Sequence, residues 1–150
     1  MDTVGLGFCF EDLPLGRQFK TVGRTVTEAD IVGFIDKIGM TEVLFTNLDF
    51  LRNVAGFEGR LAPGSMVFCF AEGLLAQATM QGTGLAFLGM QLDIKGPTFA
   101  GDTIHVECEV TEHRPASKGE RGLVRFANKV VNQRGETVLE YNPLRLLKKT

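Results

Sequence analysis

The residues with the clearest chemical potential lie around one turn, Ala62-Pro63-Gly64-Ser65. Glycine carries no side chain, so the carbonyl group of a ligand can approach the backbone closely there. The first N–H groups of a following helix have no partner inside that helix, and the helix dipole places positive charge behind them. Gly64 and Ser65 could therefore polarise a bound carbonyl as an oxyanion hole does. The alternative is a purely structural helix cap, since Pro-Gly-Ser is also common at helix starts.

Two glutamates are candidate acids or bases. Glu72 is the only charged residue in the apolar segment Met66 to Ala78, and it follows Ser65 by seven residues, which places both near one stripe of a helix. A carboxylate in such a segment is paired, lies at a subunit boundary, or takes part in function. Glu42 lies in the irregular stretch Met40 to Asp49, and irregular segments on a rigid scaffold often carry functional residues.

The two histidines are not predicted to take part in chemistry. His105 and His113 are eight residues apart on one predicted strand, and strict alternation places both on its charged, solvent-facing side. A subunit contact or a site at the strand end is the alternative. The chain contains no G-x-S-x-G motif, no P-loop and no H-E-x-x-H motif. We therefore predict no metal site, and the histidines are expected to be solvated.

Composition excludes several classes of protein. The 150 residues carry a net charge of −2, which lacks the basic excess of a nucleic-acid or membrane-surface binder. No run reaches the ~18 apolar residues of a membrane span, and no basic residue precedes Arg17 as a signal peptide would require. Three scattered cysteines with apolar neighbours predict buried, reduced thiols: Cys9, Cys69 and Cys108. We expect one cytoplasmic domain over residues 1–150.

Hydrophobic patterning predicts the elements that position these residues. A capping box at Thr27-Glu28-Ala29-Asp30 opens a helix that ends at Gly39, and a second short helix covers Leu48 to Val54. Met66 to Ala78 is apolar almost all round, which predicts a helix buried on nearly every side. Five strands are predicted: Gln18 to Thr25, Leu85 to Lys95, Thr103 to His113, Leu123 to Gln133 and Val138 to Leu147.

The order of these elements predicts an α+β fold in which a curved antiparallel sheet wraps around a buried central helix. The strand from Thr103 alternates cleanly, with Ile104, Val106, Cys108 and Val110 on its core side. A single small sheet leaves edges exposed, and dimerisation through one edge would cover it.

The chain resembles the MaoC-like hydratase/dehydratase family, which has the hot-dog fold. The segments that carry the resemblance run through most of the chain: Phe10 to Gly16, Thr27 to Ile31, Ala55 to Phe57, Leu61 to Met66, Pro97 to Thr103, Val131 to Gln133 and Gly135-Glu136. The resemblance implies binding of acyl thioesters, usually of coenzyme A, and addition of water to a 2-enoyl chain or its removal from a 3-hydroxyacyl chain. It implies no cofactor apart from the coenzyme A of the substrate, and it maps the carbonyl-binding N–H groups onto Gly64 and Ser65.

The family's D-x-N-P-x-H motif is replaced in this chain. Counting back from Ala55 places its Asp at Thr41 and its His at Thr46, and no histidine precedes His105. A threonine hydroxyl cannot exchange protons near neutral pH as imidazole does. Glu42 and Glu72 are therefore the candidate catalytic residues. The candidate substrate-binding residues are Thr41, Thr46, Asn47, Gly64 and Ser65.

Three functions are compatible with the sequence. The first is an acyl-CoA hydratase or dehydratase with a divergent residue set, and the second is a hot-dog thioesterase that uses one carboxylate and a water molecule. The third is a non-catalytic acyl-CoA-binding subunit that kept the pocket. We expect no nucleic-acid or membrane partner. We also expect a homodimer, or a dimer of dimers, with the acyl site at the subunit boundary, because the irregular segment Met40 to Arg60 needs a surface to pack on.

Overall fold

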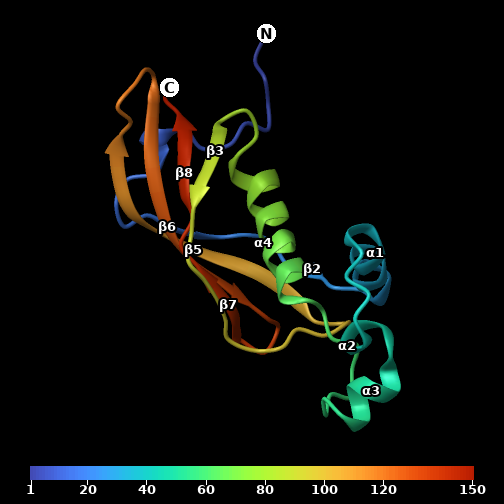
Figure 1. Ribbon diagram of the computed structural model, residues 1–150. Helices are drawn as coiled ribbons and strands as arrows, with labels where there is room; N and C mark the ends of the chain where they lie inside the picture. The colour runs from blue at the N-terminus through green and yellow to red at the C-terminus, as the bar shows by residue number, and fades with distance from the viewer.

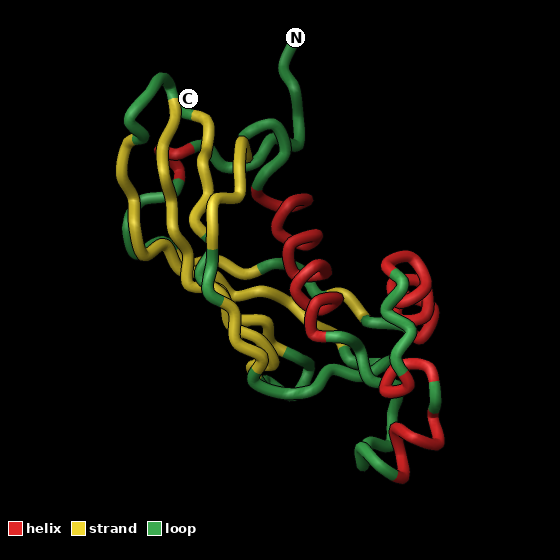
Figure 2. The backbone as a smooth tube through the Cα atoms, viewed as in Figure 1, coloured by secondary structure: helices red, strands yellow, loops and turns green.

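The curved sheet and one long helix define the molecule. The computed structural model describes residues 1–150, and its sheet curves around α4 (Gly64–Thr79), as Figure 1 shows. Three shorter helices lie near the N-terminal end of α4 (Figures 1 and 2): α1 (Glu28–Ile38) beside its N-terminal half, and α2 (Val43–Thr46) and α3 (Leu48–Asn53) beyond its end. A 3-10 turn, η1 (Phe10–Asp12), precedes the first strand. The predicted α+β architecture is confirmed.

All eight strands pair antiparallel in one sheet: β1 (Gln18–Lys20), β2 (Arg24–Thr25), β3 (Gly84–Gly89), β4 (Leu92–Ile94), β5 (Thr103–Pro115), β6 (Arg121–Val131), β7 (Thr137–Tyr141) and β8 (Leu144–Lys148). β5 and β6 form the centre, and β1 and β2 pair with the free side of β5. β8 and β7 pair with successive parts of β6, while β3 pairs with β8 and β4 with β7. The pair β3 and β4 therefore forms one edge of the sheet.

Three predicted strands are each interrupted in the structure. The segment 18–25 divides into β1 and β2, 85–95 into β3 and β4, and 138–147 into β7 and β8. Pro143 explains the last break, because proline has no N–H to donate to a ladder. Beside it, the Asn142 side chain accepts the N–H of Gln91 at 2.6 Å, in the gap between β3 and β4. β6 changes its partner from β8 to β7 at this same level.

The predicted helix ends follow from local chemistry. Thr27 and Asp30 form the capping box of α1, and Gly39 ends this helix with a φ of 73°, a left-handed conformation that glycine adopts without strain. α3 matches the predicted short helix, whereas the four-residue α2 was not predicted.

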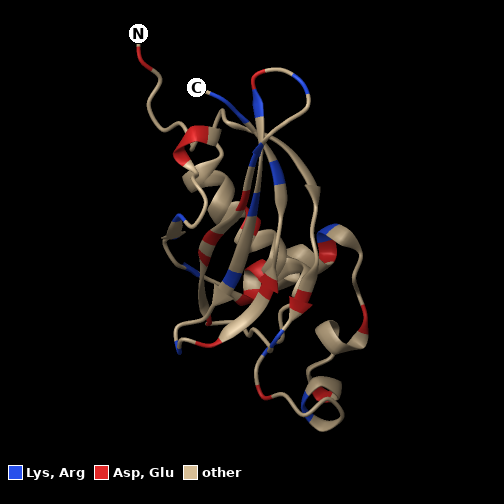
Figure 3. Cartoon of the chain, turned by 90° about the vertical axis from the view of Figure 1, so that its left-hand side faces the viewer, with Lys and Arg blue, Asp and Glu red and all other residues tan.

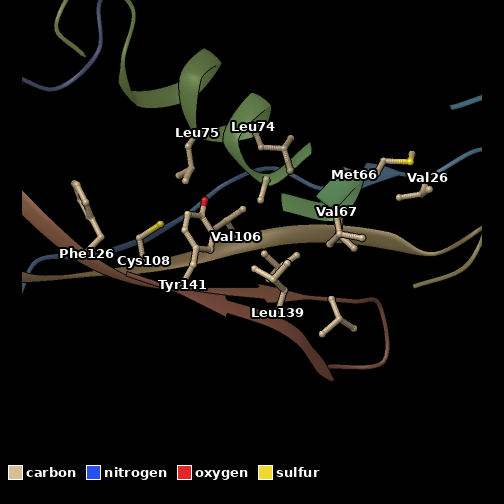
Figure 4. Packing of buried hydrophobic residues seen from close by; sticks show 14 of the residues in the cluster. Val26, Met66, Val67, Leu74, Leu75, Val106, Cys108, Phe126, Leu139 and Tyr141 are labelled. Atoms are coloured by element: carbon tan, nitrogen blue, oxygen red, sulfur yellow. The ribbon is translucent and has the colours of Figure 1, made fainter. Parts of the chain in front are cut away.

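The core lies between α4 and the concave face of the sheet (Figure 4). Ile104, Val106, Cys108 and Val110 are all buried there, which confirms the predicted core side of β5. The far side of α4 is exposed, however, at Ser65, Cys69, Ala76 and Gln77. The helix is therefore not buried on nearly every side, and the prediction that Cys69 is buried is wrong. Small side chains on this face made it look like core in the sequence.

A β-bulge between Val110 and Glu112 corrects the prediction for His113. The extra residue reverses the alternation, so the His113 ring stacks on Phe10 with centroids 3.8 Å apart, and Nδ1 donates to the Leu13 carbonyl at 2.7 Å. His113 is half-buried and serves packing. His105 lies before the bulge and stays on the outer face beside Glu107.

Charged residues of both signs are distributed over the chain, as the blue and red segments of Figure 3 show. None of the helices combines the length and the apolar character that a membrane-spanning helix needs.

Candidate functional site

A cavity of about 340 Å³ lies at the N-terminal end of α4. Its walls come from α2, from the segment that leads into α4, from the first turn of α4, and from the region of β4 and β7. Nine of the 13 lining residues are hydrophobic, and the other four are Gly64, Gly96, Pro97 and Thr98. No lining residue has an ionisable side chain, so the cavity favours an apolar guest.

Two other hollows lie away from this cavity. One of about 390 Å³ lies on the outer face of the sheet between charged side chains of β1, β5 and β6. The other, of about 10 Å³, lies behind the C-terminal half of α4 and is about the size of one water molecule. Asn128 lines this small space, and both polar atoms of its buried side chain lack a partner in the protein. Neither hollow contacts the start of α4.

The start of α4 has two backbone donors without partners, those of Gly64, which lines the cavity, and of Ser65, which is exposed and does not line it. Pro63 is the N-cap residue and offers no side-chain acceptor, while its carbonyl accepts from Met66 at 3.0 Å and from Val67 at 3.2 Å. The N–H groups of Gly64 and Ser65 have no acceptor in the protein. Helix N-termini bind negative charge and polarised oxygens through such groups. The turn therefore combines a helix start with the donor pair that an oxyanion site requires.

The absence of a side chain at Gly64 leaves space between the first turn of α4 and Ile94. A Cβ built on Gly64 would lie 2.8 Å from Ile94 Cδ1, which is closer than such atoms approach one another. Thr98 adds a polar atom to the same region, because it lines the cavity and its buried hydroxyl makes no hydrogen bond within the protein.

The predicted residues of the 41–47 segment lie around α2. Leu44 and Phe45 contribute to the cavity wall, whereas Thr41 and Thr46 are exposed and do not line the cavity. Thr46 donates its hydroxyl to the Glu42 carbonyl at 3.0 Å. Asn47 has a local role as well: its side chain caps α3 by accepting the N–H of Phe50 at 3.0 Å.

The two candidate carboxylates lie in contrasting places, and neither lines the cavity. The Glu42 side chain is exposed and makes no hydrogen bond or ion pair. Glu72 lies about two helical turns beyond Gly64 and is held on both oxygens. Tyr141 Oη donates to Oε1 at 2.7 Å, Arg145 donates to Oε2 at 2.9 Å, and a second Arg145 nitrogen contacts Oε1.

This polar cluster is largely shielded from water. Arg145 and Tyr141 are 5% and 3% exposed. Burial and the adjacent Glu72 charge raise the pKa of Tyr141 above its ordinary value, so the phenol stays protonated and donates. Alternation along β8 could have predicted that Arg145 is buried, because it lies on the same side of the strand as the apolar Leu147. Its pairing with Glu72 across 73 residues was not predicted.

The arrangement can bind an apolar chain that ends in a polarisable carbonyl. It provides donors and apolar walls, but no group in the wall that transfers protons near neutral pH. No group of three or more His, Cys, Asp or Glu residues is placed to hold a metal ion.

Comparisons with known proteins agree with this geometry. Residues 14–141 match the family described as FAS1-like, dehydratase domain region. A monoamine oxidase regulatory protein from Archaeoglobus fulgidus is 30% identical, with a TM-score of 0.82 and 96% of each chain covered. A MaoC-like dehydratase from Rhodospirillum rubrum is 25% identical, with a TM-score of 0.82, covering 96% of this chain and 99% of that one.

A protein about twice as long as this chain has a similar fold over part of its length. A Mycobacterium tuberculosis protein described as having a double hot-dog fold is 23% identical with a TM-score of 0.83, and the match covers 99% of this chain and 46% of that one. A search of curated proteins by sequence finds no match. The residues, the fold and these similarities together place the chain in the MaoC-like hydratase/dehydratase family of hot-dog proteins, to which it belongs through its FAS1-like dehydratase region.

Proposed function

We propose that this protein binds acyl thioesters of coenzyme A as a divergent hydratase/dehydratase. One observation carries the proposal: an apolar cavity is lined by Gly64, whose N–H, like that of the next residue Ser65, has no acceptor in the protein. The thioester carbonyl accepts from these groups, and the acyl chain lies between Val67 and Leu139 in the cavity. The substrate class is 2-enoyl or 3-hydroxyacyl thioesters, in keeping with the family.

The chemistry in a single chain is expected to be slow. General acid–base groups contribute roughly 10²–10⁴-fold to reactions of this kind, and the cavity wall contains none. Glu42 is exposed and Glu72 is bound by Tyr141 and Arg145, so neither is placed to move a proton at the thioester. Polarisation of the carbonyl is the catalytic contribution that the chain retains.

The same observation favours a second function, a non-catalytic acyl-CoA-binding subunit. An apolar pocket with carbonyl donors and no acid or base is sufficient for binding alone. A thioesterase would need a carboxylate that holds a water molecule beside the thioester, and no feature of the cavity favours that function.

We propose that the protein forms a homodimer through the sheet edge at β3. This strand pairs only with β8, and Leu85, Phe87 and Leu88 are exposed along it. An apolar edge with unpaired backbone groups is a site for strand addition. Ile94, which is 53% exposed, continues the same edge to the cavity, so a second copy would place the acyl site at the boundary. Sedimentation that shows a stable monomer at micromolar concentration would contradict this.

One pair of assays separates the proposed functions. Calorimetric titration with butyryl-CoA measures binding, and crotonyl-CoA incubated with the protein is followed for loss of the enoyl absorbance and for free thiol. We expect butyryl-CoA to bind and the enoyl group to react well below the ~10 s⁻¹ of a typical enzyme. Binding with no reaction supports the binding subunit, and thiol release supports a thioesterase. Failure of butyryl-CoA to bind rejects acyl-thioester binding.

A further inference from the structure

The cavity lies at one end of the packed interface between α4 and β7, and we call this interface the groove. Gly64, Phe68 and Glu72 follow one another at four-residue intervals, so they share one stripe of the helix. Leu139 and Tyr141 share the inner face of β7 opposite this stripe, since both are buried and alternate residues of a strand face the same way. In Figure 4 the Tyr141 ring follows Leu139 along the strand, and its hydroxyl points towards α4.

Two aromatic rings, those of Phe68 and Tyr141, pack together between α4 and β7 next to the cavity. Val67 and Leu139 line the cavity, but Phe68 and Tyr141 do not. The Phe68 and Tyr141 rings meet edge to face, with centroids 5.2 Å apart and planes at 89°. The Phe87 ring of β3 packs against the Phe68 ring as well, with ring centroids 6.3 Å apart. The two rings thus occupy the space into which a longer guest would extend.

The ring of Tyr141 is held in place from behind. Its hydroxyl donates to Glu72, and Glu72 is in turn fixed by two contacts from Arg145. The Arg145 guanidinium lies over the Phe87 ring at 5.2 Å. Moving Tyr141 aside would break a shielded hydrogen bond to a charged group, which is among the stronger interactions of its kind.

From this geometry we propose that Phe68 and Tyr141 set the chain length of the acyl group, and that the protein takes short acyl thioesters. The inference rests on the proposed acyl-thioester binding at Gly64. One helical turn separates Gly64 from Phe68, about 5.4 Å, which is the length of about four carbon–carbon bonds in an extended chain. A butyryl or hexanoyl group fills this distance, while the end of an octanoyl group meets the two rings.

The test is the affinity of a series of saturated acyl-CoA molecules, measured by calorimetry on the full chain. Each methylene that enters the cavity should tighten binding by about fourfold. For the wild type we expect affinity to rise up to butyryl-CoA or hexanoyl-CoA and to be at least tenfold weaker for octanoyl-CoA. In Phe68→Ala the maximum should move to octanoyl-CoA or longer.

A matched control distinguishes an opened groove from a loosened core. Leu75→Ala also truncates a large apolar side chain of α4. Leu75 lines the small space behind the C-terminal half of α4, away from the cavity and from the contact between Phe68 and Tyr141. Leu75→Ala should leave the preferred chain length unchanged. If circular dichroism shows that Phe68→Ala does not fold, Phe68→Leu opens less space and should shift the maximum by a smaller step.

The outcomes keep the two proposals apart. If butyryl-CoA fails to bind the wild type, acyl-thioester binding itself is rejected. If butyryl-CoA binds and affinity keeps rising through decanoyl-CoA, the rings do not limit the chain. The proposal is also overturned if a folded Phe68 variant keeps the wild-type maximum, or if Leu75→Ala shifts it equally.

Discussion

At Gly64 the groove along α4 has apolar walls and two backbone donors without partners, whereas at Glu72 it is filled by an ion pair whose carboxylate oxygens are all bonded. Both places lie on one stripe of one helix. Glu72 carries a full charge and is paired inside the protein. The backbone N–H of Gly64 carries only a partial charge, has no partner and lies at the cavity. The proposed binding site uses the unsatisfied backbone N–H groups beside the cavity, while the carboxylate of Glu72 in the apolar helix is part of the internal packing.

The strongest test of this contrast is Glu72→Ala. Removing one partner of a shielded ion pair leaves Arg145 buried and unpaired, which typically destabilises a protein by about 3–5 kcal/mol. Urea denaturation should show this loss. The exposed Glu42→Ala should stay within about 0.5 kcal/mol of the wild type. Equal stabilities of the two variants would show that the Glu72 pair does not hold the groove.

A gain of function tests the other end of the groove. Thr41→Asp combined with Thr46→His returns an acid and a base to the segment around α2, whose Leu44 and Phe45 line the cavity. Thr41 and Thr46 themselves are exposed and do not line the cavity, so crotonyl-CoA hydration should rise by less than the ~10²-fold that is the lower range of acid–base contributions. A larger rise would show that the two positions reach the thioester. Thr41→Asn with Thr46→Gln is the control without proton transfer. A wild type that already reacts at ~10 s⁻¹ or more would show that another residue carries the chemistry.

The need for an open backbone at the helix start can be tested with two glycines of α4. In Gly64→Ala the new Cβ forces Ile94 to move at the mouth of the cavity, so butyryl-CoA should bind about tenfold more weakly, or about 1.4 kcal/mol. Gly73 has open space around its Cβ position, and Gly73→Ala should leave binding unchanged while improving helix propensity. If both variants bind like the wild type, Gly64 does not shape the site.

Sequence reasoning succeeded where short-range patterns decide the structure. The alternation from Ile104 to Val110 and the capping box at Thr27 were sufficient to place a core face and a helix start. It failed where one residue changes a register, as at the bulge after Val110, which turns His113 inward. The sequence also indicated that Glu72 needs a partner, but Arg145 becomes that partner only through strand pairings that no local pattern reveals.

The smallest expected effect concerns the wall of the cavity. Asp102 anchors the turn that contains Pro97 and Thr98, by accepting the N–H of Phe99 at 2.9 Å and the Gln133 amide at 2.8 Å. Burial alone would raise the pKa of this carboxyl. The hydrogen bonds from Gln133 and Phe99 and the charge of Arg134 outweigh burial and leave the pKa below the ordinary 3.8.

A lowered folded-state pKa fixes the sign of the pH dependence. The ionised Asp102 stabilises the fold above its unfolded-state pKa, and this stability disappears as pH falls through the lower folded-state value. Asp102→Asn should therefore be less stable than the wild type at neutral pH, and the two urea midpoints should converge as pH falls below 3.8. The exposed Asp93→Asn is the control at the same end of the sheet. A difference between wild type and Asp102→Asn that stays constant down to low pH would show that the ionised carboxylate does not hold the wall.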